Sequence, residues 1–87
     1  MTIDSAGARF SYPIFLDLTD LLVLVVGGGR IGARTADGLV AAGARVRLVA
    51  EDVSEFVDVA SMREVRTKTF AVNDLDDVRL VLSAPGD

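Results

Sequence analysis

Apolar residues along this chain gather in runs that polar stretches separate. Residues 21–26 form a continuous apolar run and residues 78–83 a largely apolar one, which is typical of parallel strands buried on both faces. Arg45 to Ala50 alternates charged and apolar side chains at its start and predicts a second strand. Glu64 to Thr69 alternates more weakly and predicts a third strand, near a sheet edge.

Helical spacing appears between the first two of these runs. The apolar positions from Ile31 to Ala42 recur at helical intervals, and Gly43 follows as a helix terminator. Gly38 inside the helix costs about 1 kcal/mol relative to alanine. We attribute its presence to a close approach of helix and sheet.

Two shorter helices are expected in the second half of the chain. One covers Val53 to Val59, with Asp52 or Ser54 as its cap, and the other covers Val72 to Asp76. Strands and helices then alternate, which predicts a parallel α/β sheet. The expected strand order is 3-2-1-4, a Rossmann-like fold truncated after the fourth strand.

The N-terminal region precedes this pattern. Residues 1–11 are expected to be a flexible tail, and residues 12–87 a single, incomplete domain. The apolar segment Tyr12 to Leu16 is expected to pack its aromatic side chains on that domain.

Composition excludes several classes of function. The net charge is −4, which argues against nucleic-acid binding, and the chain has neither cysteine nor histidine, which excludes thiolate chemistry and most metal sites. No signal peptide is recognisable, and the longest apolar run is far shorter than the roughly 20 residues of a membrane helix. We therefore expect a cytoplasmic protein with no membrane or nucleic-acid partner.

The turn after the first strand carries the clearest chemistry. Gly27, Gly29 and Gly32 form a G-x-G-x-x-G pattern, with Gly28 inside it, between a predicted strand and a predicted helix. In this pattern the first glycine permits the tight turn, the second lets a pyrophosphate approach the backbone, and the third lets the helix pack closely. The motif and its context predict a dinucleotide site.

Two groups of residues are expected to contact such a cofactor. The N–H groups of Arg30 and Ile31 lie in the first helical turn, where an anion binds. An acid that accepts the ribose hydroxyls is expected at the end of the second strand, but Ala50 occupies that position and Glu51 and Asp52 follow it. Glu51 either reaches the ribose from the loop, favouring NAD over NADP, or is a solvated acid.

Other candidates border the same end of the sheet. Ser83 and Ala84 end the fourth strand, where they either line the cofactor or form a simple turn. Arg45 and Arg47 share one face of the second strand. Exposed strand charges are the favoured interpretation for them, with contact to a 2′-phosphate as the alternative.

Several segments together resemble one family. Residues 12–18 followed by 23–29 are similar to the opening of siroheme synthase and precorrin-2 dehydrogenase. Residues 41–46 resemble the family's "A-G-A-x-V" passage, and residues 70–84 its "F-x-x-x-D-L" passage and the strand that follows. The resemblance covers nearly the whole chain from Tyr12 onward.

The resemblance implies NAD-dependent oxidation of precorrin-2 to sirohydrochlorin in siroheme biosynthesis. It implies cofactor contacts at Arg30, Ile31, Glu51 and Asp52, and, in many members, insertion of ferrous iron or a fused methyltransferase. The family's acid–base aspartate lies in a later segment that this sequence does not contain, so no catalytic or metal-binding residue is assigned. We accordingly expect a fragment or truncated product that binds NAD.

Two further expectations accompany this interpretation. The alternative function is a non-catalytic dinucleotide-binding or nucleotide-sensing module, whereas the absence of a Tyr-x-x-x-Lys pair argues against a short-chain oxidoreductase. An open edge at the fourth strand would favour pairing between copies, so a homodimer is expected. None of the acids shows a sign of burial in the sequence.

Overall fold

All strands run parallel in one sheet. A computed structural model describes residues 2–4 and 17–84. Within them the strands are β1 (Thr2–Asp4), β2 (Leu22–Val26), β3 (Arg45–Ala50), β4 (Glu64–Thr67) and β5 (Leu80–Ser83). The order across the sheet is β1-β5-β2-β3-β4. The four strands expected from the sequence therefore have the predicted order 3-2-1-4, and the Rossmann-like topology is confirmed.

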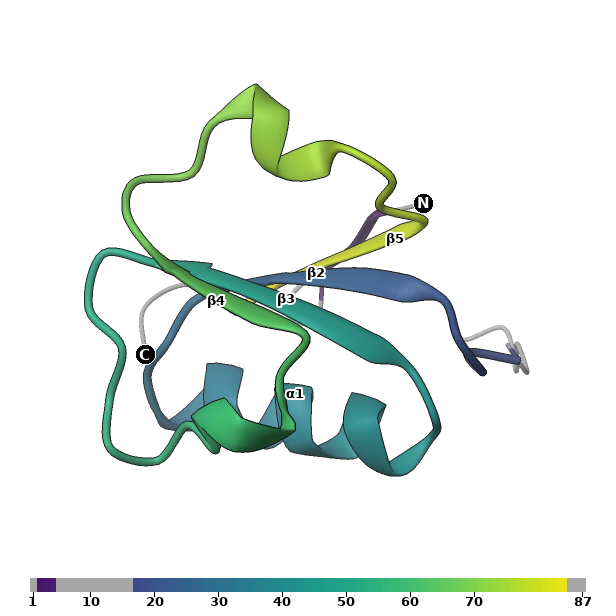
Figure 1. The fold of residues 1–87 in the computed structure, drawn as a ribbon. Helices are drawn as coiled ribbons and strands as arrows, with labels where there is room; N and C mark the ends of the chain where they lie inside the picture. The colour runs from purple at the N-terminus through teal and green to yellow at the C-terminus, as the bar shows by residue number, and fades with distance from the viewer. Residues whose placement is uncertain (1, 5–16, 85–87) are drawn as a thin grey trace.

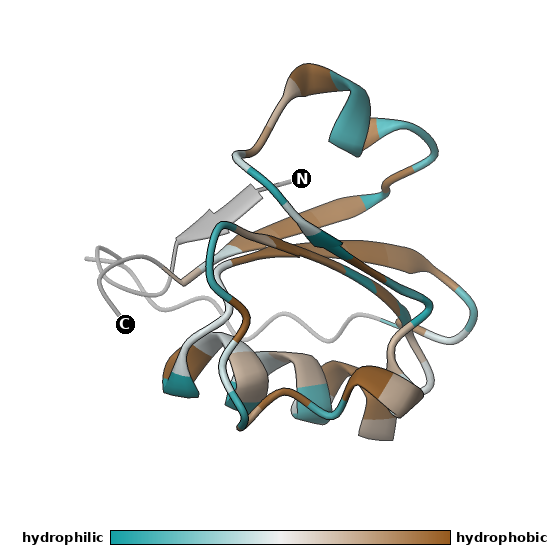
Figure 2. Cartoon of the chain, turned by 60° about the vertical axis from the view of Figure 1, so that its left-hand side comes forward, coloured by the Kyte–Doolittle hydropathy of each residue, from teal (hydrophilic) through white to brown (hydrophobic). Residues whose placement is uncertain are grey.

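The main core lies between the sheet and α1 (Arg30–Ala41), which covers one face of the sheet (Figure 1). Val23 and Val25 of β2 and Leu48 of β3 are fully buried and belong to the same cluster as Ala33 and Ala36 of α1. Figure 2 shows the hydrophobic character concentrated on the central strands β2 and β5. Because side chains along a strand alternate between the two faces of the sheet, Val23, Val25 and Leu48 point to the face that α1 covers.

The helix expected at Val53–Val59 is wrong. A short 3₁₀ helix, η1, covers Val59–Ser61 instead. The preceding residues are tied to other elements: the N–H of Ser54 donates to the carbonyl of Gly28 at 2.8 Å, and Val57 is buried in the core. These tertiary contacts determine an irregular path where the local pattern fitted a helix.

The N-terminal segment contains a strand that the sequence analysis did not predict. Residues 2–4 lie parallel to β5, with Thr2 opposite Val81 and Asp4 opposite Ser83. The edge of β5, which was expected to be open, is therefore paired within the chain. The remainder of the predicted tail and the segment Tyr12–Leu16 lie outside the described residues.

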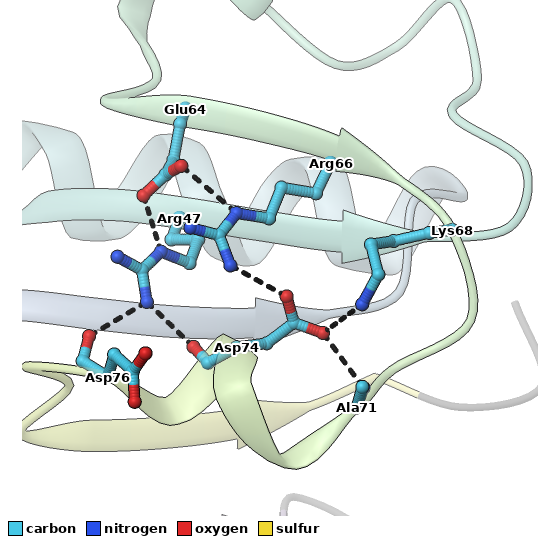
Figure 3. Close-up of polar contacts among 7 residues, drawn as sticks. All are labelled: Arg47, Glu64, Arg66, Lys68, Ala71, Asp74 and Asp76. Carbon is cyan, nitrogen blue, oxygen red and sulfur yellow. Dashed lines mark hydrogen bonds and ion pairs between the residues drawn. The ribbon is translucent and has the colours of Figure 1, made fainter.

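Charged side chains occupy the sheet face opposite α1, where the 3₁₀ helix η2 (Val72–Leu75) crosses (Figures 1 and 3). Arg47 is only 7% exposed. Its guanidinium pairs with Glu64 and donates to the carbonyls of Asp74 and Asp76 at 2.7 and 2.8 Å. The expectation that Arg47 is exposed is wrong, because it fixes the η2 segment to the sheet.

Asp74 is the buried acid that the sequence analysis missed. Its carboxylate, 1% exposed, accepts hydrogen bonds from Arg66 at 2.8 Å, Lys68 at 2.6 Å and the N–H of Ala71 at 2.8 Å (Figure 3). The bond from Lys68 is the largest cause that holds the pKa of Asp74 well below its ordinary range, followed by that from Arg66. Asp74 is therefore a charged structural anchor.

Candidate functional site: a cleft at the glycine turn

A cleft of about 540 Å³ opens at the carboxyl ends of β2, β3, β4 and β5. This is where ligands bind in open parallel sheets. The cleft contains seven of the nine site residues predicted from the sequence: Gly27, Gly28, Gly29, Glu51, Asp52, Ser83 and Ala84. The remaining two, Arg30 and Ile31, begin α1 beside it.

The glycine turn is packed on both sides. Gly27 has a φ of +131°, and a Cβ there would lie 2.6 Å from the carbonyl oxygen of Ala84. A Cβ on Gly32 would lie 2.2 Å from the carbonyl oxygen of Gly27, so α1 packs directly on the turn. A Cβ on Gly28 would lie 2.5 Å from the carbonyl oxygen of Asp52. The turn thus joins the loops after β3 and β5 to the start of the helix.

The start of α1 is suited to an anion. Gly29 occupies the N-cap position without a side-chain capping bond, and the first turn contains no acidic residue. First-turn N–H groups have no carbonyl partner within a helix, and the helix dipole adds partial positive charge there. The Arg30 side chain lies elsewhere, with its guanidinium 4.7 Å from the centroid of the Phe56 ring, and Ile31 is 52% exposed. At the helix start, therefore, only the backbone of Arg30 and Ile31 is placed to meet an anion.

The loop after β3 provides the acidic wall. Glu51 and Asp52 are exposed and line the cleft. Thr69, in the loop after β4, donates its hydroxyl hydrogen to Glu51 Oε1 at 2.7 Å. The acid is thus held beside the cleft although it lies one residue beyond the end of β3.

Sequence reasoning did not assign several cleft residues to the site, among them Lys68, Thr69, Phe70 and Ser54. Lys68 and Thr69 were assigned to a strand, but β4 ends at Thr67, so both lie in the loop at the carboxyl edge together with Phe70. Ser54 was considered only as a helix cap. Its Oγ is buried and has no hydrogen-bond partner within the described part of the chain. The rule that ligands lie beyond strand ends would have identified the first three, had the end of β4 been placed correctly.

The arginines of β3 are not part of this cleft. Arg47 is held by Glu64 and η2, and Arg45 is exposed and donates to the carbonyl of Asp20 at 3.0 Å. Neither lines the cavity. The interpretation of either as a 2′-phosphate ligand is therefore not supported by its position.

The parallel sheet, the glycine turn and the cleft at the carboxyl edge together define a Rossmann-like dinucleotide-binding domain. A nicotinamide dinucleotide fits the residues present, because the turn combines close backbone packing with a helix start that lacks a side-chain capping bond, and the buried hydroxyl of Ser54 beside it has no hydrogen-bond partner among the described residues. A family model described as NAD(P)-binding matches residues 14–87, and the chain belongs to that family.

Known relatives show which enzymes this chain is similar to. Over 78 residues the chain is 42% identical to "Siroheme synthase 1" of Serratia proteamaculans, covering 86% of this chain and 16% of the relative. It is 43% identical over 75 residues to "Siroheme synthase" of Saccharophagus degradans, covering 83% and 16% of the two chains. The chain thus spans about a sixth of the length of these relatives. The recognised resemblance to siroheme synthases is confirmed.

A solved structure agrees. The structure named "SirC, precorrin-2 dehydrogenase" superposes with a TM-score of 0.77 at 33% sequence identity, over 88% of this chain and 40% of that one.

Among the described residues, no helix is long and apolar enough to cross a membrane. The same residues contain no cluster of three metal-ligating side chains.

Proposed function

We propose that this chain is the NAD-binding part of a precorrin-2 dehydrogenase that oxidises precorrin-2 to sirohydrochlorin in siroheme biosynthesis. The observation that carries the proposal is the glycine turn, which packs against the loops after β3 and β5 and opens a cleft at their ends. The similarity to siroheme synthases and to "SirC, precorrin-2 dehydrogenase" supports the substrate and the pathway.

The charges around the cleft favour NAD over NADP. Glu51 and Asp52 place two carboxylates on the wall expected to face the adenosine ribose. The nearby cation, Lys68, is bonded to Asp74, and Arg47 is held by Glu64. A 2′-phosphate would therefore meet the negative charge of Glu51 and Asp52, while Lys68 and Arg47 already have carboxylate partners.

The residues of this chain bind and orient the cofactor. When bound, the nicotinamide supplies the hydride acceptor for oxidation of the tetrapyrrole. Backbone N–H groups at Gly29, Arg30 and Ile31 would hold the pyrophosphate, and Ser83 and Ala84 would border the cofactor at the end of β5. No described residue is assigned to proton transfer. Ferrous iron insertion and a cytoplasmic location of the whole enzyme remain predictions from the sequence. Homodimerisation also remains a prediction, although the strand edge from which it was argued is paired with β1.

The test is calorimetric titration of the chain with NAD and, in parallel, with NADP. Gly29→Leu is the informative variant, because Gly29 has an extended backbone that other residues adopt, and a bulky side chain there lies where the pyrophosphate is proposed to bind. Gly38→Ala, on an exposed part of α1, is the matched control. We expect saturable NAD binding that Gly29→Leu abolishes and Gly38→Ala preserves. A folded chain that binds neither dinucleotide would refute the proposal.

A further inference from the structure

Thr69 faces the acidic wall of the cleft from the loop after the neighbouring strand, β4. The pairing of β3 with β4 sets Ala50 beside Thr67, and one further backbone bond, from the N–H of Lys68 to the carbonyl of Ala50 at 2.9 Å, extends this pairing past the end of β4. Continued by one step, this register sets Glu51 beside Lys68, and Thr69, one residue further on, reaches Glu51 with its hydroxyl although the two lie 18 positions apart in sequence. The strand pairing and the loop after β4 together bring the hydroxyl to the carboxylate.

The hydrogen bond restrains a side chain that has little else to hold it. Glu51 is exposed, and the 2.7 Å bond from Thr69 engages only Oε1. An exposed glutamate samples several rotamers, and a ligand that needs one of them must pay the entropy of selecting it. With Oε1 bonded to Thr69, Oε2 has no hydrogen bond to another described residue and can accept a second donor.

We infer that Thr69 is a positioning residue that fixes the Glu51 carboxylate at the ribose edge and thereby sets the preference for NAD over NADP. Thr69 acts on the proposed NAD site, so its role depends on that proposal. A fixed carboxylate accepts the ribose hydroxyls of NAD and repels the 2′-phosphate of NADP. Without the hydroxyl of Thr69, Glu51 rotates away, which weakens NAD binding and relaxes the exclusion of NADP.

The experiment compares Thr69→Val, which keeps the side-chain shape, with Thr69→Ser, which keeps the hydroxyl. Each variant and the unmodified chain are titrated calorimetrically with NAD and with NADP, and circular dichroism checks the fold. We expect Thr69→Val to lower NAD affinity roughly three- to tenfold and to reduce the NAD-to-NADP preference. Thr69→Ser should restore both quantities. In a Glu51→Gln background, Thr69→Val should no longer change the preference.

The outcomes separate the two proposals. If the unmodified chain binds NAD and Thr69→Val shows the same preference for NAD over NADP, the role of Thr69 is refuted and the NAD site stands. Equal weakening of NAD and NADP by Thr69→Val, or no rescue by Thr69→Ser, would make Thr69 a merely structural residue and also overturn the inference. Failure of the unmodified chain to bind NAD overturns both.

Discussion

The same chemical change at two glycines should have opposite effects on stability. Gly38 lies on the exposed side of α1, and a Cβ added there meets no atom within 4 Å. The close helix–sheet approach expected from the sequence is therefore wrong, and the glycine carries only its cost in helix propensity. Gly38→Ala should raise the free energy of unfolding by about 0.5–1 kcal/mol.

Gly28→Ala should act in the other direction. Its Cβ would lie 2.5 Å from the carbonyl oxygen of Asp52, 2.9 Å from the Cβ of Ala50 and 3.1 Å from the Cα of Val53. Two of these three atoms are backbone and cannot rotate aside, so the loop after β3 must move. We expect a loss of about 1–3 kcal/mol, within the range for overpacked sites.

Chemical and thermal denaturation of the two variants measure the difference. One kcal/mol corresponds to about 4–8 °C in melting temperature for a domain of this size, so the pair should lie on opposite sides of the unmodified chain by an easily resolved interval. NAD binding should weaken in Gly28→Ala, since the displaced loop carries Glu51 and Asp52. A destabilised Gly38→Ala, or a Gly28→Ala variant as stable as the parent, would refute the packing described for the turn.

Three further predictions concern polar groups. Asp74 has a lowered folded-state pKa, so the stability it contributes is present above its ordinary pKa of 3.8 and is lost as pH falls further. Asp74→Asn should therefore flatten the acid limb of a pH-denaturation profile. An unchanged acid limb would contradict this. Arg47→Ala should cost about 3 kcal/mol in urea unfolding because it removes one of the two cations that bind Glu64, the other being Arg66, and leaves the carbonyls of Asp74 and Asp76 without their donor, whereas Arg45→Ala, at an exposed site, should stay within about 0.5 kcal/mol. Ser54→Ala removes a buried hydroxyl that has no partner in the described part of the chain and should stabilise the chain by up to about 1 kcal/mol. An accompanying fall in NAD affinity in calorimetry would show that the cofactor uses that hydroxyl.

The elements that sequence patterning predicted are those whose signal is local. The apolar run of β2, the helical spacing of α1 and the glycines between them specify a buried strand, a helix and a tight turn without reference to the rest of the chain. Their alternation with β3 and β5 then determines the parallel order. Seven of the residues predicted to contact a cofactor line one cleft, because strand ends in such a sheet converge on one edge.

What the sequence could not show depends on distant partners. Burial of Arg47 requires acceptors at Asp74 and Asp76, far along the chain, and no local pattern specifies them. The same holds for Asp74, which is surrounded in sequence by exposed residues. The irregular segment before η1 follows a path determined by Gly28 and the core rather than by its own helical propensity. Long-range pairing overrides local preference at each of these positions.

Different interactions attach the segments on the two faces of the sheet, and each face contributes one wall of the cleft. α1 adheres through closely packed apolar side chains, whereas the segment from Lys68 to Leu75 is mostly exposed and is fastened at Asp74 by hydrogen bonds and ion pairs. Regions with few buried apolar contacts open at lower free energy than the core. We therefore expect amide hydrogen exchange to be faster in this segment than in β2 and β3. A dinucleotide would then enter and leave past Phe70 while the glycine turn stays rigid. The segment from Lys68 to Leu75 would set the rate of exchange, and the glycine turn would set the shape of the site.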